Sequence, residues 1–362
     1  MTNPTKNSRV IVAMSGGVDS SVAAALLVEH GLDVVGVTMR VASGEGRSHS
    51  DKACCTLDAA QDAHRVADKL GFPHYVVNYL ERFEREVIGD FVEEYLNGRT
   101  PNPCSRCNQR VKFGALYEKA MAVHADYIAT GHYVRSALRD GRVGLRRGVY
   151  HPKDQSYTLA GLSQAQLERA IFPLGELTKD EVRAKAQALN LVTWDKPESQ
   201  EICFVPEDNY RDFLAERIGP QKPGPIVNVG GETVGEHEGL VNYTVGQRRG
   251  LGIAAPEPYY VLRIDVKSNT LVVGHKADTG AHRLRAGQVN WCAIEKPTAP
   301  VDCLIQIRAH HTPVPCTVTP MPDGFEAEFH TPESSVAPGQ WAVLYDDDDF
   351  VLAGGIIDDY AF

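Results

Sequence analysis

A run of serine, glycine and aspartate near the N-terminus has the composition of an anion-binding loop. It reads Ser15-Gly16-Gly17-Val18-Asp19-Ser20-Ser21. Glycine lets the backbone approach an anion closely, and a helix N-terminus offers N–H groups and a positive dipole end. We therefore expect the serine hydroxyls and backbone amides to hold a pyrophosphate group. The run lacks the lysine of a P-loop that serves γ-phosphate transfer, so it predicts a different phosphate chemistry.

Two cysteines three residues apart form the second candidate for chemistry. They lie in Pro101-Asn102-Pro103-Cys104-Ser105-Arg106-Cys107-Asn108, where the prolines predict an extended loop. Positive charge from Arg106, Arg110 and Lys112 would favour the thiolate form of both cysteines. Half of a four-cysteine zinc site is the alternative, but the sequence holds no second Cys-x-x-Cys pair to complete it.

A third cysteine lies further along, in Glu198-Ser199-Gln200-Glu201-Ile202-Cys203-Phe204. Alone, a cysteine in such a run predicts a core side chain. A chemical role for Cys203 is therefore expected only in combination with Cys104 and Cys107. The remaining five cysteines lack charged or ligand-spaced neighbours, and we expect them to pack as small apolar side chains. They are Cys54, Cys55, Cys292, Cys303 and Cys316.

The elements that must position these residues alternate between strands and helices up to about residue 200. The patterns predict strands at 9–14, 33–39, 74–78 and 127–130, and helices at 20–30, 56–70, 83–96 and 113–124. Such alternation predicts an α/β fold with a doubly wound parallel sheet, whose ligands lie at the carboxyl ends of the strands.

Beyond Phe204 the composition changes to glycine- and proline-rich segments and then to short β-rich runs. The runs lie at 260–266, 270–273, 303–308, 316–319, 325–329 and 342–344. We expect a catalytic domain at 1–206, a small central domain at 207–277 and a β-barrel domain at 278–362. The acidic run Asp346 to Asp349 predicts a solvated turn, and His310 and His311 are expected on opposite faces of a strand.

Overall charge and composition narrow the class of protein. The 362 residues carry a net charge of −10, with 43% hydrophobic and 23% charged residues, as in a soluble globular protein. Residues 96–153 hold eleven Lys or Arg against three Asp or Glu, which is +8 there and −18 elsewhere. This segment predicts a basic face for nucleic acid. A polar start and no long apolar run favour the cytoplasm and no membrane association.

Taken together, the motifs resemble the tRNA-specific 2-thiouridylases, a family of PP-loop ATP pyrophosphatases. The resemblance rests on eight strings in one order: 15–21, 54–55, 100–108, 129–133, 153–157, 199–204, 243–253 and 338–340. It implies an enzyme that uses ATP to adenylate C2 of the wobble uridine in tRNA. Sulfur then replaces the C2 oxygen, giving 2-thiouridine, AMP and pyrophosphate.

The resemblance also implies roles for individual residues. Cys107 would be the nucleophile and Cys203 the persulfide carrier, and the two could form a disulfide. ATP would be bound by Ala13, Met14, Ser15, Gly16, Gly17, Val18, Asp19, Ser20, Met39 and Gly131. Asn102, Pro103 and Cys104 would meet the target base, and His132, Lys153, Asp154, Gln155, Arg308, Ala309 and Gln340 would touch the tRNA. Mg²⁺ is expected with ATP, and a persulfide-donating cysteine desulfurase or sulfur-relay protein is the expected sulfur source.

One departure from the family pattern leaves the sulfur chemistry open. Members often have aspartate where this chain has Cys104. Cys104, Cys107 and Cys203 could then hold a [4Fe–4S] cluster, as in related tRNA-thiolating enzymes, instead of using a persulfide. Two further rivals are a nitrogen-using PP-loop synthetase, which would have no use for three cysteines, and a non-catalytic tRNA-binding protein, which would have no use for residues 15–21.

Overall fold

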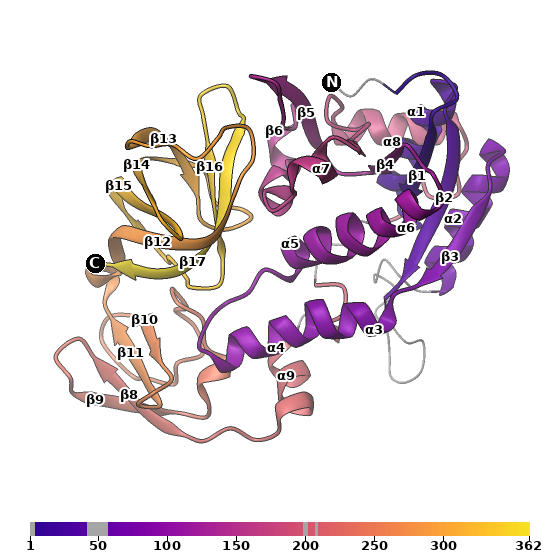
Figure 1. Cartoon of the computed structure of the whole chain (residues 1–362). Coiled ribbons are helices and arrows are strands. Elements are labelled where there is room, and N and C mark those ends of the chain that lie inside the picture. Colours follow the sequence, from indigo (N-terminus) through magenta and orange to yellow (C-terminus); the bar gives the residue numbers. More distant parts are fainter. Residues whose placement is uncertain (1–3, 42–56, 198–201, 207–208) are drawn as a thin grey trace.

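The N-terminal part is built on a five-stranded parallel sheet. The computed structural model describes residues 4–41, 57–197, 202–206 and 209–362. The strands are β1 (Arg9–Ala13), β2 (Asp33–Arg40), β3 (His74–Asn78), β4 (Tyr127–Thr130) and β7 (Ala170–Ile171). They pair in parallel in the order β3-β2-β1-β4-β7, which confirms the predicted parallel sheet (Figure 1).

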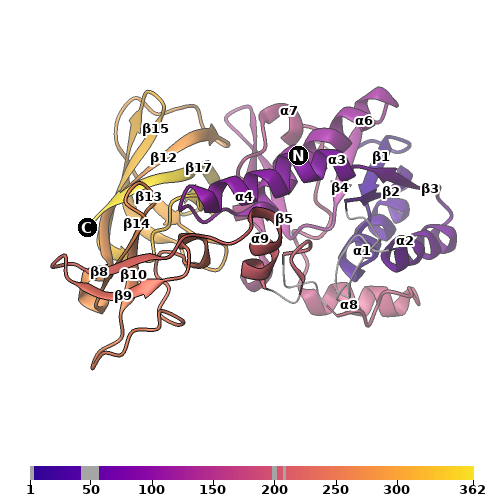
Figure 2. The same cartoon turned by 90° about the horizontal axis from the view of Figure 1, so that it is seen from below.

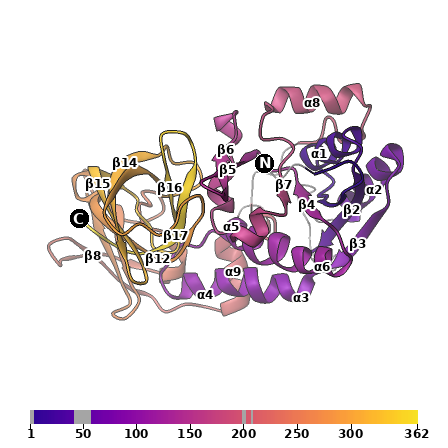
Figure 3. The same cartoon turned by 45° about the horizontal axis from the view of Figure 1, so that its top comes forward.

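Helices cover both faces of this sheet. On one side lie α1 (Val18–Glu29), α2 (Leu57–Leu70) and α8 (Lys179–Ala188) (Figure 3). On the other lie two long helices, each interrupted by wider turns: α3 (Leu80–Phe83) and α4 (Gly89–Leu96) around 84–88, and α5 (Pro103–Cys107) and α6 (Leu116–Ala122) around 108–115. Val10 and Val12 pack on the first side and Ile11 on the second, as strand alternation requires. None of the described helices is long and apolar enough to cross a bilayer.

The cysteine pair lies on a helix, so the expected extended loop at 101–108 is wrong. The side chain of Asn102 accepts a hydrogen bond from the backbone N–H of Ser105 at 3.0 Å, which caps the start of α5. Pro103 occupies the first turn, where proline's fixed φ suits a helix and its missing N–H costs nothing. The same residues that favour a loop therefore begin a helix here.

Two β-rich units complete the chain. The middle sheet has the order β10-β11-β8-β9. Its elements are α9 (Tyr210–Ile218), β8 (Gly224–Asn228), β9 (Thr233–His237), β10 (Tyr260–Asp265) and β11 (Thr270–Gly274). The last unit is a closed barrel, which together with the parallel sheet confirms the predicted fold class. Its strands are β12 (Gly280–Trp291), β13 (Val301–Gln306), β14 (Val314–Met321), β15 (Gly324–Ser334), β16 (Trp341–Tyr345) and β17 (Val351–Ala361).

A hairpin of the N-terminal part contacts the barrel. It consists of β5 (Val134–Arg139) and β6 (Arg142–Arg147), and a segment with two short 3-10 turns, His151–Lys153 and Ser156–Leu159, leads from it to α7 (Gln164–Leu167). The helix formed by α3 and α4 runs from the sheet toward the barrel and the middle sheet (Figures 1 and 2). His310 and His311 lie in a turn after β13, so their expected placement on a strand is wrong.

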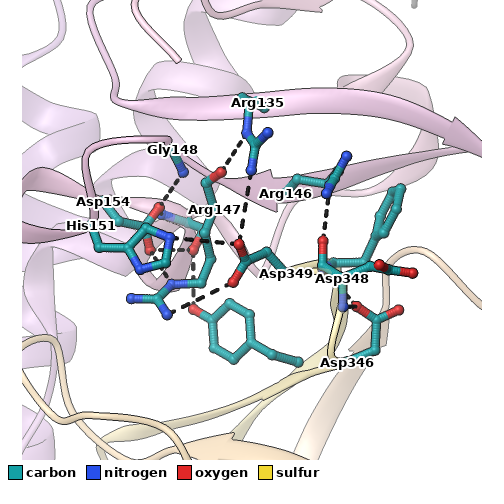
Figure 4. Close-up of polar contacts among 12 residues, drawn as sticks. Arg135, Arg146, Arg147, Gly148, His151, Asp154, Asp346, Asp348 and Asp349 are labelled. Atoms are coloured by element: carbon teal, nitrogen blue, oxygen red, sulfur yellow. Dashed lines mark hydrogen bonds and ion pairs between the residues drawn. The ribbon is translucent and has the colours of Figure 1, made fainter. Parts of the chain in front are cut away.

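The acidic turn between β16 and β17 is only partly the solvated turn expected from its sequence: Asp347 and Asp348 are exposed, whereas Asp346 and Asp349 are half-buried against the hairpin (Figure 4). Asp346 forms an ion pair with Arg139, and Asp349 lies 3.9 Å from both Arg135 and Arg147. Arg146 donates to the carbonyl of Asp348 at 3.0 Å. Four of the eleven basic residues counted in 96–153 therefore have partners in this turn.

Candidate active site

The predicted anion loop connects β1 to α1 and is held by its own serines. The backbone N–H of Ser15 donates to the Ser20 hydroxyl at 3.2 Å. The hydroxyls of Ser20 and Ser21 donate to the carbonyl of Gly17 at 3.1 and 2.9 Å. No described side chain caps the start of α1, whose N-terminus opens onto this loop. The loop is therefore preformed at a positive helix end, as an anion site requires.

Two glycines allow the close approaches on which this geometry depends. Gly16 has φ +69°, and a Cβ there would lie 2.1 Å from the carbonyl oxygen of Ala59. A Cβ on Gly131 would lie 2.7 Å from the backbone of Asp19 and of Ser20. Gly131 follows β4, while Met39 is a buried residue near the end of β2. The residues predicted to bind ATP thus gather at the carboxyl ends of β1, β2 and β4.

Two lysines and a tyrosine that the sequence reasoning missed also reach this loop. Lys179 Nζ lies 2.7 and 2.9 Å from the two carboxylate oxygens of Asp19. The Tyr133 hydroxyl donates to the same carboxylate at 2.7 Å. Lys196 Nζ donates to the carbonyl of Gly16 at 3.1 Å. The helix-starting pattern at Thr178 and Glu181 marks where α8 begins, but nothing in the sequence connects Lys179 to Asp19.

The two thiols of α5 share one helix face because they are three residues apart. Cys104 is exposed and Cys107 is half-buried. Between them in sequence, Arg106 is buried and lies 3.2 Å from the carboxylate of Asp90, which also lies 3.3 Å from Arg110. Burial lowers the pKa of Arg106, and the charge of Asp90 acts in the opposite direction. Two of the three cations expected to favour the thiolates, Arg106 and Arg110, are therefore paired with Asp90.

Helix α4 brings the third cysteine to the same region. Phe204, next to Cys203, contacts the ring of Phe91 with centroids 5.3 Å apart. Phe91 directly follows Asp90, the partner of Arg106. Cys107 and Cys203 are half-buried and pack against the same apolar cluster. The structure thus associates the two predicted sulfur residues through one helix and one core. Residues 199–201 of this motif, like Cys54 and Cys55, lie outside the described residues.

The other cysteines and the metal hypothesis can be assessed from the same side chains. Cys292 and Cys316 are buried, as expected for packing residues, and Cys303 Sγ lies 3.7 Å from Cys316 Sγ across β13 and β14. Throughout the described ranges, no group of three or more His, Cys, Asp or Glu side chains is gathered closely enough to hold a metal ion. The arrangement of Cys104, Cys107 and Cys203 therefore does not by itself fit a three-thiolate cluster site.

Several residues predicted to touch tRNA have internal partners. His132 is 8% exposed, lies 2.6 Å from the Thr130 hydroxyl, and burial lowers its pKa well below the usual range. The Asp154 side chain is 5% exposed and pairs with Arg147 at 3.2 Å. Arg308 and Ala309 are exposed in the turn after β13. The contacts of these residues with tRNA stay predictions. Of the four, Arg308 and Ala309 are the two whose side chains are exposed.

A chain of hydrogen bonds joins the anion loop to the thiol helix. Tyr133, which holds Asp19, donates its backbone N–H to the Gln155 side chain at 3.0 Å. The backbone N–H of Thr158 donates to the carbonyl of Gln155 at 3.1 Å. The side chain of Asn108, next to Cys107, then donates to the carbonyl of Thr158 at 3.2 Å. These hydrogen bonds link the side chain that holds Asp19 of the loop to the residue next to Cys107.

The barrel fixes the segment that leads into the thiol helix. The side-chain amide of Gln340 donates to the carbonyls of Thr100 and Pro101 at 2.9 and 3.3 Å. The backbone N–H of Thr100 donates to the carbonyl of Pro338 at 2.7 Å. Tyr157 exchanges hydrogen bonds of 2.9 and 3.1 Å with the backbone of Trp341. The position of α5 thus depends on the barrel as well as on the parallel sheet.

Comparison with known proteins identifies one family along the whole chain. Residues 8–207 match the tRNA methyl transferase HUP domain, residues 211–275 a tRNA methyl transferase PRC-barrel domain, and residues 281–357 an aminomethyltransferase beta-barrel domain. The chain is 46% identical over 358 residues to a tRNA-specific 2-thiouridylase of Pelotomaculum thermopropionicum, covering 98% of each chain. Its identity to the corresponding protein of Carboxydothermus hydrogenoformans is 48% over 356 residues, covering 97% of each.

A third relative extends the agreement. The tRNA-specific 2-thiouridylase of Geobacter metallireducens is 50% identical over 359 residues, which covers 97% of this chain and 96% of that one. Each of these matches covers the sheet, the middle unit and the barrel. The chain therefore belongs to the tRNA-specific 2-thiouridylase family.

Proposed function

We propose that the chain is an ATP-dependent tRNA sulfurtransferase that converts the wobble uridine to 2-thiouridine. The observation that carries this proposal is the chain of hydrogen bonds from Asp19 in the anion loop to Asn108 beside Cys107. A non-catalytic tRNA-binding protein would need no such connection, and a nitrogen-using synthetase would have no role for the thiols. Family membership supplies tRNA as the substrate class.

The first half of the reaction activates the uridine. Its C2 oxygen is a poor leaving group, and adenylation by ATP converts it into one that departs as AMP. The loop amides and the N-terminus of α1 would stabilise the pyrophosphate that is released. We assign Ala13 to Ser20, Met39 and Gly131 to ATP, with Mg²⁺ accompanying the nucleotide. The uridine must leave its stacked position to reach the thiols.

The second half delivers sulfur. In this proposal Cys203 carries a persulfide, and its terminal sulfur attacks C2 as AMP leaves. The Cys107 thiolate attacks the inner sulfur, breaks the persulfide S–S bond and forms a disulfide with Cys203. An external dithiol must then reduce this disulfide, and a cysteine desulfurase or sulfur-relay protein must restore the persulfide. Their shared apolar cluster supports this pairing of Cys107 and Cys203.

The iron–sulfur alternative requires Cys104 as a third ligand. Three thiolates would hold a [4Fe–4S] cluster and leave one iron open for sulfide. The structure gives Cys104 a position on the same helix face as Cys107, but the described side chains do not gather into a metal-binding group. We therefore favour the persulfide route. Iron and sulfide analysis after anaerobic purification separates the two, since iron-free protein with full activity excludes the cluster.

The test of the function itself is reconstitution with unmodified tRNA, ATP and a persulfide donor. We expect 2-thiouridine at the wobble position by nucleoside mass analysis, together with pyrophosphate release that requires tRNA. Omission of ATP should abolish both products. Thiouridine at another position, or none in the presence of every component, would contradict the proposal. We also propose that the protein acts in the cytoplasm and that its first two domains end at residues 206 and 277.

A further inference from the structure

The anion loop carries a carboxylate but no cation of its own. Residues 14–21 contain Asp19 and no Lys or Arg. The Asp19 side chain is 35% exposed, so it is partly shielded from water. An uncompensated carboxylate beside bound phosphates would repel them, most strongly where solvent is excluded. A loop of this kind therefore needs positive charge from elsewhere in the fold.

Lys179 provides such a charge. It begins α8, is 7% exposed, and contacts both carboxylate oxygens of Asp19. Its Nζ also lies 5.8 Å from the centre of the Tyr133 ring. A buried ion pair adds little stability compared with a well-packed apolar pair. Stability alone is therefore a weak reason for a lysine at this position.

Lys196 provides a second charge from another segment. Its Nζ donates to the carbonyl of Gly16 and forms an ion pair with Asp62 on α2. Its side chain is 32% exposed, so it has access to an entering ligand. The two lysines reach the loop at Gly16 and at Asp19. Asp62 also pairs with Arg65 at 3.1 Å, so Lys179, Lys196 and Arg65 together exceed the charge of the two carboxylates Asp19 and Asp62.

We propose that Lys179 and Lys196 are the cations of the pyrophosphate site. They compensate Asp19 and Asp62 and hold the β- and γ-phosphates of ATP, an inference that rests on the proposed function. In the transfer step the uridine C2 oxygen bonds to the α-phosphorus. The bond from that phosphorus to the bridging oxygen breaks, and pyrophosphate leaves with the electron pair. The lysines stabilise this charge and transfer no proton.

Calorimetric titration with ATP, AMP and inorganic pyrophosphate tests the assignment on the full chain. Lys179→Met and Lys196→Met remove one charge each and keep most of the side-chain length. We expect Lys179→Met to weaken ATP and pyrophosphate binding at least ~10-fold. AMP binding should change less than ~2-fold, because AMP lacks the β- and γ-phosphates. Lys196→Met should follow the same pattern with a smaller loss, and Lys179→Arg should retain most of the affinity.

The matched control is Lys185→Met. Lys185 lies on the same helix but pairs with Glu29 at 2.8 Å, and its removal should leave all three affinities unchanged. Equal losses for AMP and ATP in Lys179→Met would assign Lys179 to the fold and overturn the inference, as would unchanged ATP affinity in both lysine-to-methionine variants. Wild-type protein that binds neither ATP nor pyrophosphate would instead overturn the proposed function, and the inference with it.

Discussion

The anion loop is held by hydrogen bonds between neighbours in sequence and by side chains of the same N-terminal part, whereas the thiol site also draws on the barrel. Ser15, Ser20 and Gly17 hold the loop through mutual hydrogen bonds. The thiol site needs α5, the Cys203 turn about a hundred residues later and the barrel residue Gln340. A site built locally tolerates changes in domain docking, while a composite site does not. Substitutions at the thiols and at the barrel should therefore separate sulfur transfer from nucleotide binding.

The largest difference between the loss of thiolation and the loss of ATP binding is expected for substitutions of Cys107 and Cys203. Cys107→Ser and Cys203→Ser should each lower 2-thiouridine formation by at least ~100-fold, because a required nucleophile is lost. ATP affinity should remain within ~2-fold of wild type, since the loop does not depend on either thiol. Cys303→Ser in the barrel is the control. Nucleoside mass analysis and calorimetry provide the two readouts.

Cys104→Ser distinguishes the two sulfur routes within the same experiment. The persulfide route predicts a milder loss than at Cys107, since Cys104 takes no part in sulfur exchange. The cluster route predicts a loss as complete as that of Cys107→Ser, because all three thiolates hold the iron. Retention of activity in Cys107→Ser would show that Cys107 is not the required nucleophile. The proposed division between a nucleotide loop and a thiol site would then fail.

A smaller effect is expected at the contact between the barrel and the thiol helix. Gln340→Ala removes the hydrogen bonds to the carbonyls of Thr100 and Pro101. Each is worth about 1 kcal/mol, so loss of both predicts a fall in kcat for thiolation of up to roughly 30-fold, with ATP affinity preserved. Gln187→Ala, at an exposed position of α8, serves as the control. An equal loss of ATP affinity would show that the loop also depends on the barrel.

The smallest effect concerns His132, which follows Gly131 at the end of β4. Burial holds its pKa well below 6.5, so the folded protein keeps it neutral while the unfolded chain protonates it as the pH falls. Its contribution to stability is therefore complete above pH 6.5 and decreases below it. Between pH 7.5 and 5.5 the free energy of unfolding should fall about 1 kcal/mol less in His132→Asn than in wild type.

Urea unfolding at the two pH values measures this difference. His282→Asn, at an exposed barrel position, is the control and should follow the wild-type pH dependence. An identical pH dependence in His132→Asn and wild type would mean that His132 protonates equally in the folded and unfolded states. That result would contradict the burial of this ring between Phe113 and Phe172.

The same contrast explains how much could be predicted from the sequence. The loop at 15–21 and the strands β1 to β4 follow from local patterns, because residue types and alternation within each segment are enough to predict them, even though β1 pairs with the distant β4. The helix at Pro103 was misread because Asn-Pro both interrupts one element and starts another. The partners of Lys179 and of Asp349 lie more than a hundred residues away, so only the folded chain identifies them.

The oxygen atom of the target uridine provides the most direct test of the account. tRNA carrying ¹⁸O at C2 of the wobble uridine is incubated with ATP and the persulfide donor, and the released AMP is analysed by mass spectrometry. Adenylation of that oxygen predicts one ¹⁸O in the AMP for each 2-thiouridine formed. Unlabelled AMP accompanied by full thiolation would contradict the account, because the C2 oxygen would then leave by a route that does not involve ATP.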